Sequence, residues 1–370
     1  MLAYYYNSFF YLKCQIKFLK VCAKNLFNMN TNTCLKLNIM KKNFLFLLML
    51  LFSFACKKES SGPNSNGPAS SSAVYVVGSS FNGSQYVATI WKNGVATGLS
   101  ATSSGSSHAS SVFVSGNDVY VVGRSYNGSS MVATIWKNGV ASVLSPLPDW
   151  TATSVFVSGV DVYVAGYCMD AGNPGAKVWK NGVATSLFGV NNRVVRSLFV
   201  SGSDVYVVGV SNINNNSVAT IWKNGVATAL SLGSGLSSDA KSVFVSGNDV
   251  YVAGTVQDTI ISNSIAVVWK NGLLTALSSS YSAVFSVSIS GNDVYLAGEI
   301  GSKAIIWKNN ISTALSASSS FTNSVFVSGN DVYVAGNVRN GSGYFATLWK
   351  NGVSTSLSGS ESYASSVFVK

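Results

Sequence analysis

The residues that could perform chemistry in this 370-residue chain are few and scattered. His108 is the only histidine, so a nucleophile that needs an imidazole base has one residue to draw on. No glycine-rich phosphate motif leads from a strand into a helix. The acids that stand outside a repeated turn are Glu59, Asp149, Asp170, Asp239, Asp258, Glu299 and Glu361. We therefore predict no catalytic residue and no cofactor.

An enzyme remains the alternative. Paired carboxylates for glycoside cleavage would have to come from different parts of the chain. A carbohydrate-active lyase or hydrolase would need at least two side chains to converge near a central channel, drawn from Asp149, Asp170, Asp239, His108 and Arg193.

The cysteines give no framework for disulfides or metal ions. Cys14, Cys22 and Cys34 lie in the first segment, Cys56 follows an apolar run, and Cys168 alone lies in the repeated part of the chain. Six aspartates recur in one tight turn, where we expect their carboxylates to bind local amides: Asp118, Asp161, Asp204, Asp249, Asp293 and Asp331. A calcium site would need several acids within one loop, so we predict no metal.

The positive charge is concentrated before Cys56. The net charge is +11, but seven of the lysines precede Cys56, which leaves 17 basic against 13 acidic residues, a net of about +4. Binding to nucleic acid requires a concentrated basic patch. The sequence therefore predicts no nucleic-acid partner.

A tryptophan followed by a lysine recurs seven times, and such indoles could stack on sugars. Each stands beside the same tight turn, which favours a wedge between neighbouring structural units. The tryptophans are Trp91, Trp136, Trp179, Trp222, Trp269, Trp307 and Trp349. We expect the lysines that follow them to form a solvated positive rim, which could attract anionic headgroups or polysaccharide.

These elements belong to a repeat of about 44 residues, of which residues 324–358 are a clear example. Short segments rich in Val, Tyr, Phe and Thr predict strands at 324–328, 331–336, 345–349 and 353–357. Gly-Asn and Asn-Gly pairs predict tight hairpin turns between them. Seven copies of four strands predict an all-β fold, a seven-bladed β-propeller of four-stranded antiparallel blades.

The two ends of the array predict a closed ring. It starts on a second strand at 73–78 and stops after a first strand at 366–370. We therefore expect the C-terminal strand to complete the first blade, whereas an open stack would need polar caps. We expect a monomer.

The connections between strands divide into two sets. The first-to-second and third-to-fourth turns hardly vary and must share one side of the ring, the invariant face, where residue 73 enters. The other connections vary and must share the opposite side, the variable face, where loops on a rigid scaffold could bind a ligand. The candidate ligand-binding residues are His108, Tyr126, Trp150, Tyr167, Asp170, Arg193, Tyr281 and Tyr344. The plain alternative is that these are ordinary loop residues.

The segment before the repeats has the features of a leader. We interpret residues 1–39 as lying upstream of a true start at Met40, the alternative being an N-terminal membrane segment. Residues 40–55 predict a lipoprotein signal peptide, and residues 52–56 resemble a bacterial lipobox, with Ser53 where Leu is usual. The resemblance implies lipid attachment at Cys56, the alternative being an ordinary secreted protein in which this cysteine occurs by chance. The Ser-, Gly-, Pro- and Asn-rich composition that follows predicts a flexible tether over 56–72, and the repeats place the propeller over 73–370.

The repeat also resembles a known propeller family. Residues 112–123 are similar to the kelch arrangement, but with one Gly where kelch has two and with Trp at the end of strand three. The Trp-Lys-Asn-Gly turn is similar to short repeats of some bacterial extracellular proteins. These resemblances imply a cell-envelope lipoprotein of the outer-membrane type, periplasmic or surface-exposed. We predict a non-catalytic module that binds carbohydrate or envelope protein; the third interpretation is an accessory subunit of an outer-membrane complex.

Overall fold

The computed structural model describes residues 72–99, 105–168, 175–187, 191–230, 236–258, 264–341 and 343–370. The chain divides into two units, Met1–Ala69 and Ser70–Lys370, and all of the described residues belong to the second. The predicted leader, Cys56 and the predicted tether up to residue 71 lie outside the described residues.

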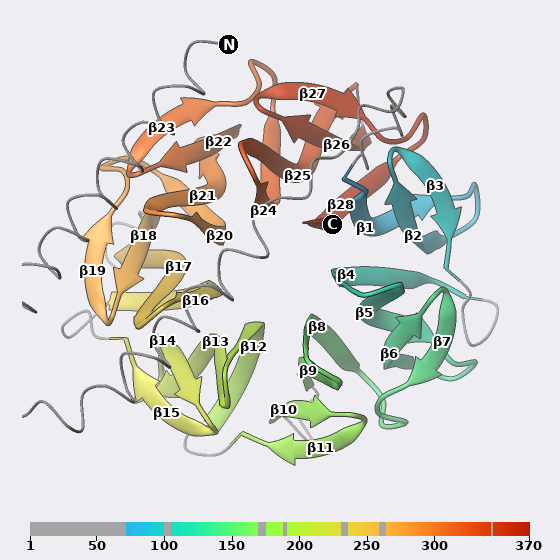
Figure 1. Cartoon of the computed structure of the whole chain (residues 1–370), viewed down its shortest axis with the longest axis horizontal. Coiled ribbons are helices and arrows are strands. Elements are labelled where there is room, and N and C mark those ends of the chain that lie inside the picture. The colour runs from blue at the N-terminus through green and yellow to red at the C-terminus, as the bar shows by residue number, and fades with distance from the viewer. Residues whose placement is uncertain are drawn as a thin grey trace, which may run out of the picture. The chain divides into compact units, whose positions relative to one another are not determined.

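The described residues form seven four-stranded antiparallel sheets arranged in a ring (Figure 1). The innermost strands of blades 1 to 7 are β28 (Ser362–Val369), β4 (Ser107–Ser115), β8 (Trp150–Ser158), β12 (Asn191–Ser201), β16 (Leu236–Ser246), β20 (Ser282–Ser290) and β24 (Ser320–Ser328). The second strands are β1 (Val74–Phe81), β5 (Asp118–Tyr126), β9 (Asp161–Cys168), β13 (Asp204–Ile213), β17 (Asp249–Asp258), β21 (Asp293–Ile300) and β25 (Asp331–Asn340).

The third strands are β2 (Tyr86–Lys92), β6 (Met131–Lys137), β10 (Gly175–Lys180), β14 (Asn216–Lys223), β18 (Ser264–Lys270), β22 (Lys303–Lys308) and β26 (Gly343–Lys350). The outermost are β3 (Val95–Gly98), β7 (Val140–Val143), β11 (Val183–Ser186), β15 (Val226–Ala229), β19 (Leu273–Ala276), β23 (Ile311–Ala314) and β27 (Val353–Ser356). The all-β prediction and the seven-bladed propeller are confirmed.

The tight turns follow from the residues that occupy them. In each third-to-fourth turn the Asn has a φ of 49–53°, and the Gly that usually follows has a φ of 82–84°. Two successive positive φ angles define the type I′ turn, which matches the twist of antiparallel strands. In blade 6 the second residue is Asn310, with a φ of 69°.

The innermost strands are longer than predicted because each contains a bulge. In blade 2 the register shifts between Ala109 and Ser111, so Ser110 has no partner on β5. Such a bulge breaks the alternation of apolar and polar residues, which hides the first half of β4 from sequence-based prediction. The two strands also approach closely here: a Cβ atom at Gly123 would lie 1.9 Å from the His108 carbonyl oxygen, so only glycine fits.

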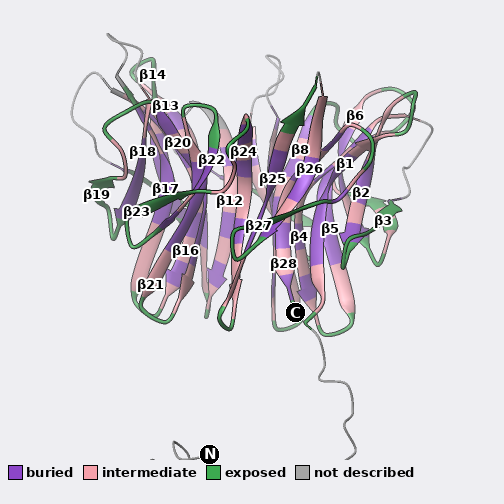
Figure 2. Cartoon of the chain, turned by 90° about the horizontal axis from the view of Figure 1, so that it is seen from above, coloured by how far each residue is buried: buried purple, intermediate pink, exposed green. Residues whose placement is uncertain are grey.

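The core lies between blades, and Figure 2 shows buried residues concentrated in the middle of the strands. All seven repeat tryptophans are at most 1% exposed. Trp222 of blade 4, for example, packs with Ala165 and Ala176 of blade 3, and Trp91 of blade 1 packs with Tyr333 and other residues of blade 7. The prediction that tryptophans wedge between blades is confirmed.

The ring closes where the sequence predicted. β28 pairs with β1 from Val74↔Val369 to Ser80↔Ser362. Next to this pairing, the Ala73 amide donates to the Lys370 carbonyl at 2.8 Å, and the Lys370 amide donates back to the Ala73 carbonyl at 3.0 Å. Both ends of the ring therefore meet at the edge where the first-to-second turns lie.

The serine after each bulge joins neighbouring innermost strands. The Val155 amide donates to Ser111 Oγ at 3.3 Å, and the Leu198 amide to Ser154 Oγ at 3.1 Å. Similar bonds join the following blades. Each such bond satisfies a buried or partly buried backbone amide with the serine side chain of the preceding blade.

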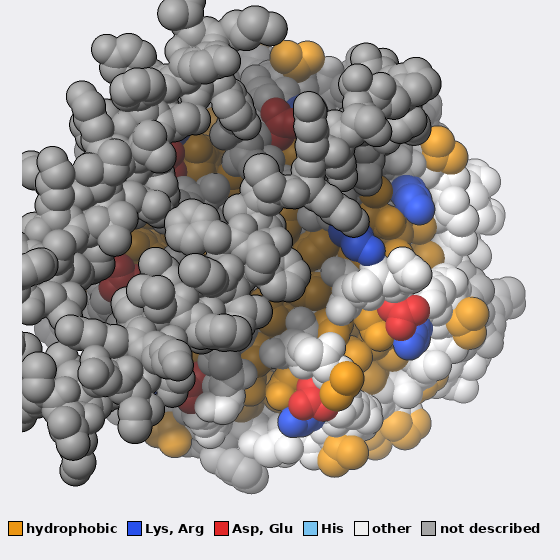
Figure 3. All heavy atoms as spheres, viewed as in Figure 1, with side chains coloured by type: hydrophobic (Ala, Val, Ile, Leu, Met, Phe, Trp, Pro, Cys, Tyr) orange, Lys and Arg blue, Asp and Glu red, His pale blue; other side chains and the backbone are white. Residues whose placement is uncertain are grey.

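The invariant face is a network of ion pairs, which Figure 3 shows as adjacent blue and red side chains. In blade 2, Asp118 accepts from Lys137 Nζ at 2.8 Å and from Asn138 Nδ2 at 2.8 Å, and Lys137 lies 5.3 Å from the centre of the Tyr120 ring. The turn aspartates therefore bind the third-to-fourth turn rather than local amides, because the two turns are adjacent in space.

This network also corrects the predicted positive rim. Six of the lysines that follow the tryptophans are paired with an aspartate: Lys137, Lys180, Lys223, Lys270, Lys308 and Lys350. The hydrogen bond from lysine lowers the pKa of each aspartate, and for Asp118 the bond from Asn138 adds to this effect. Only in blade 1, where Ala73 stands at the aspartate position, does no such acid face the lysine.

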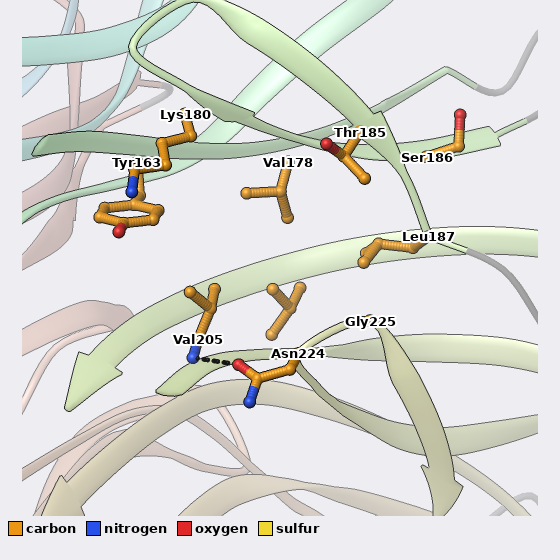
Figure 4. A pocket seen from close by; sticks show the side chains of 10 residues that line it. Tyr163, Val178, Lys180, Thr185, Ser186, Leu187, Val205, Asn224 and Gly225 are labelled. Carbon is orange, nitrogen blue, oxygen red and sulfur yellow. Dashed lines mark hydrogen bonds between the residues drawn. The ribbon is translucent and has the colours of Figure 1, made fainter. Parts of the chain in front are cut away.

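A shallow pocket of about 200 Å³ lies between blades 3 and 4 (Figure 4). Its walls include Val178, Leu187 and Val207, with the turn residues Asn224 and Gly225 at its edge. Val178 occupies a position that is Ile in blades 1, 2, 4 and 6. Blade 5 also carries Val at this position, Val268, so the smaller side chain alone does not explain the pocket.

Replacing Trp222 with Ala is expected to lower the free energy of unfolding by about 3–5 kcal/mol, because it removes a fully buried indole from between two blades. Thermal or denaturant unfolding of the full chain measures this loss. The control is Val226→Ala in the same blade, where the side chain is 70% exposed. An equal free energy of unfolding for the two variants would contradict the packing of Trp222 between two blades.

Candidate functional site

The predicted ligand-binding residues whose side chains the structure describes do not form one cluster. Tyr281 is 55% exposed on the connection before β20, and Tyr126 is half-buried at the end of β5. Tyr167 is half-buried and packs against the core between blades 3 and 4. Asp170 and the side chain of Arg193 lie outside the described residues. His108 and Tyr344 are the two that belong to a common set of contacts, described next.

Trp150 is not the exposed loop residue that was expected. It is 2% exposed and packs edge-on against Trp179, with ring centroids 5.6 Å apart. It begins β8 at a position that is serine in five of the other blades, and there the serine Oγ accepts an amide hydrogen bond from the preceding blade, as Ser107 does from Ala88. Because this position lies between blades, the indole is buried there.

An arc of aromatic side chains crosses three neighbouring blades at the variable face. Phe321 of blade 7 contacts Tyr344 with ring centroids 5.2 Å apart, and Tyr344 contacts Tyr363 of blade 1 at 6.1 Å. Tyr363 contacts Tyr86 at 5.9 Å, and Tyr86 contacts His108 of blade 2 at 5.9 Å. Phe81 adds a sixth ring, 5.4 Å from Tyr86. All six are half-buried, and we call them the aromatic arc.

The rest of the ring shows that the fold does not need this arc. His108, Phe321 and Tyr363 occupy one position of the innermost strand, where the other blades carry Thr151, Val194, Asp239 and Ala283. Tyr86 and Tyr344 occupy the start of the third strand, where blades 4, 5 and 6 carry Ser217, Ser264 and Ser302. The same strand positions therefore accept small or polar residues in other blades, and the aromatic rings gather on blades 7, 1 and 2.

Polar groups accompany the rings. The Tyr363 hydroxyl donates to Glu361 Oε1 at 3.2 Å. Burial and this hydrogen bond raise the pKa of Tyr363 to about 12, and burial together with Glu361 raises the pKa of Tyr86. Both phenols are therefore neutral and able to donate hydrogen bonds at neutral pH.

The histidine at the end of the arc is neutral at physiological pH. Burial lowers the pKa of His108, and the positive charge of Arg124 lowers it further. Arg124 lies opposite His108 across the β4–β5 pair and is exposed. A neutral imidazole presents one donor and one acceptor, so His108 can bind a hydroxyl group in either sense.

Towards the invariant face, phenylalanine rings line the centre of the ring. Phe113 contacts Phe156 and Phe368 with ring centroids 4.8 and 4.9 Å apart, and Phe199, Phe244 and Phe326 continue the series at 4.8 Å. In blade 6 the equivalent residue is Ser288. We call these six rings the phenylalanine girdle.

A charged cluster lies on the innermost strands of blades 4 and 5. Asp239 Oδ2 accepts from Arg196 Nη2 at 3.2 Å and also from Lys241 Nζ. The exposed side-chain fractions are 35% for Arg196 and 21% for both Asp239 and Lys241. The sequence singled out Asp239 but not its two partners: Arg196 lies on another blade, and Lys241 lies on the same strand as Asp239, at the bulge.

The residues named for an enzyme are not brought together where they are described. His108 and Asp239 occupy equivalent strand positions, but on blades 2 and 5. Asp149 is exposed in the connection before β8, with a φ of 60°. Within the described ranges, no group of three histidine, cysteine or acidic side chains is placed to hold a metal ion. The described segments also contain no helix with the length and hydropathy of a membrane span.

Comparison with known proteins adds little beyond the architecture. No protein-family model and no curated protein matches the sequence, so the kelch-like resemblance stays a prediction. Among solved structures, TolB from Acinetobacter baumannii is 13% identical, with a TM-score of 0.45 over 64% of this chain and 60% of TolB.

Two enzymes are similar at the same level. Pyrococcus horikoshii acylaminoacyl peptidase is 14% identical, with a TM-score of 0.43 over 68% of this chain and 45% of the peptidase. Trypanosoma rangeli sialidase in complex with sialic acid is 10% identical, with a TM-score of 0.42 over 79% of this chain and 56% of the sialidase. This chain thus spans less than two thirds of each of these three proteins. The class that the seven sheets define is the seven-bladed β-propeller.

Replacing Glu361 with Gln is expected to lower the pKa of Tyr363 from about 12 while leaving it above 10, because burial, the larger cause, persists. In the wild type, the raised pKa contributes stability below pH 10 that is lost as the pH rises towards 12. The difference in alkaline absorbance titration between each protein and its Tyr363→Phe counterpart measures this pKa. An unchanged value would contradict the hydrogen bond.

Proposed function

We propose that this propeller is a non-catalytic binding module and that it holds carbohydrate at the aromatic arc on its variable face. The observation that carries the proposal is the confinement of six contacting rings to blades 7, 1 and 2, where the other blades use small or polar residues. Rings that the fold does not require are available for a ligand.

The chemistry of the arc suits a sugar. Half-buried rings offer flat apolar contact at low cost in conformational entropy. The Tyr363 hydroxyl, the Glu361 carboxylate and the neutral imidazole of His108 add donors and acceptors beside those faces. A mostly apolar surface with a few fixed polar groups is typical of small-molecule sites, and a run of several rings fits an oligosaccharide better than a single sugar.

The variable face could instead bind an envelope protein, and the aromatic arc alone does not separate the two ligands. An enzyme is less well supported, because the described acids and His108 that catalysis would need lie on different blades. If the protein is an accessory subunit of an outer-membrane complex, its protein partner would also bind the variable face. The binding experiment below separates these alternatives.

We place the protein in the cell envelope, attached to a membrane by lipid at Cys56. This proposal rests on the predicted signal peptide and lipobox, and the topology gives it an orientation. Residue 73 enters the ring on the invariant face, whereas the aromatic arc lies at the other end of strands about 30 Å long. The arc would then face away from the membrane.

An apolar collar at the rim of the invariant face supports this orientation. The first residue of each outermost strand, directly after the type I′ turn, is a branched aliphatic side chain that is 68–77% exposed: Val95, Val140, Val183, Val226, Leu273, Ile311 and Val353. Figure 3 shows hydrophobic side chains at this outer rim. One such side chain from every blade gives the rim an apolar character that suits contact with the bilayer interface.

Replacing Tyr344 with Ala is expected to weaken oligosaccharide binding about tenfold, because truncation of a central aromatic contact removes much of the binding free energy. Full-length protein in detergent would be tested on an array of oligosaccharides, with a parallel pull-down from envelope extract. The control is Tyr281→Ala, which removes an exposed tyrosine outside the arc. Turnover of a glycan would support an enzyme, and equal binding by both variants would contradict the site.

Cysteine labels test the orientation in whole cells. A probe at Val140→Cys, in the collar, is expected to be quenched by a bilayer-embedded quencher more strongly than a probe at Ser129→Cys, on the opposite edge of the same blade. The native Cys168 is buried and should not react. Stronger quenching at residue 129 would reverse the proposed orientation.

A further inference from the structure

The bulge places one extra residue in every innermost strand, where it has no partner on the second strand. The residues at this position are Ser110, Thr153, Arg196, Lys241, Phe285, Asn323 and Ser365. Only blades 4 and 5 carry cations there, and these two blades are neighbours. Since no other blade needs a charge at the bulge, the fold does not explain the pair.

The two cations share one carboxylate. Arg196 and Lys241 both bind Asp239 Oδ2, so the cluster keeps a net charge of +1. Lysine has three donors and arginine has five, and the shared oxygen uses only one from each. Arg196 Nε and Asp239 Oδ1 are buried without a hydrogen-bond partner among the described residues. The donors that the shared oxygen leaves unused on the two partly exposed cations are available to a ligand.

The cluster faces the aromatic arc across the ring. In a closed ring of seven, blades 4 and 5 are each three steps from blade 1, which carries Tyr86 and Tyr363. The innermost strands of all these blades surround the same axis (Figure 1). A ligand on the arc that extends towards the axis therefore approaches Arg196 and Lys241 from the opposite side.

The phenylalanine girdle determines the direction of entry. Phe199 and Phe244 follow Arg196 and Lys241 by three residues, which is about 10 Å nearer the invariant face. Their rings and the four others form an apolar lining on six of the seven innermost strands. Passing these rings would remove water from the polar groups of a ligand, which costs free energy. A polar ligand would therefore reach the two cations from the variable face.

We propose that Arg196 and Lys241 form a carboxylate-binding subsite and that the ligand is an acidic glycan containing hexuronate residues. This inference rests on the proposed binding at the aromatic arc. A carboxylate takes charge-assisted hydrogen bonds from both cations, whose charges are only half balanced by Asp239. Sugar rings stacked on the arc and a carboxylate bound to the charged cluster would use both sides of the ring.

The test compares a hexuronate oligosaccharide with its carboxyl-reduced, neutral counterpart, using isothermal titration calorimetry on the full-length protein in detergent. The wild type is expected to bind the acidic form more tightly. Lys241→Gln is expected to weaken binding of the acidic form about tenfold without affecting the neutral form. Asp239→Asn raises the local charge to +2 and is expected to tighten binding of the acidic form.

The two variants are expected to change the affinity for the acidic form in opposite directions. This difference separates a ligand contact from a structural role, since a role in folding alone gives no reason for Asp239→Asn to tighten binding. The matched control is Lys303→Gln, which removes an exposed charge at the variable face of blade 6 and should change neither affinity. Equal binding of the acidic and neutral forms by the wild type would overturn the subsite while leaving the aromatic arc. Binding of neither form would overturn the proposed function itself.

Discussion

The contact between neighbouring blades is the interaction on which this structure depends. No blade buries its tryptophan within its own sheet, because Trp222 needs the alanines of blade 3 and Trp91 needs blade 7. Stability is therefore shared around the ring, and a blade without a neighbour would expose an indole and a valine-rich sheet face. β28 supplies the last of these contacts, so the closing pair of β1 and β28 is as much a part of the core as any tryptophan.

This dependence separates the two faces. On the invariant face, aspartate, lysine, asparagine and tyrosine satisfy one another within each of blades 2 to 7, as Asp118, Lys137, Asn138 and Tyr120 do in blade 2. A change there would leave a charged side chain without its partner. Among the described residues of the variable face, no comparable network repeats from blade to blade. Side chains at that edge can therefore differ between blades at little cost to folding, and they do so at the aromatic arc and at the charged cluster.

The sequence predicted the parts of the structure that repeat. The spacing of the tryptophans indicated the number of blades, and the Asn-Gly pairs indicated the turns. Prediction failed where a single residue departs from the repeat. Trp150 was expected on a variable-face loop, yet it is buried at a position where five other blades have serine. Lys241 was missed for a different reason, since the bulge that frees it from pairing has no sequence signal of its own. Contacts across blades, such as Tyr344 with Tyr363, depend on ring closure and cannot be derived from periodicity.

The rigidity of the ring bears on what the site can do. His108 and Asp239 occupy the same strand position but stand three blades apart, and the bonds between innermost strands keep them there. A reaction that needs an acid and a base on one bond requires groups within a few ångströms of the reacting atoms, and the closed ring holds these two on separate blades. Binding has no such requirement, because a long ligand can contact distant groups at once. Fixed, well-separated contacts are therefore better suited to recognising an extended molecule than to cleaving it.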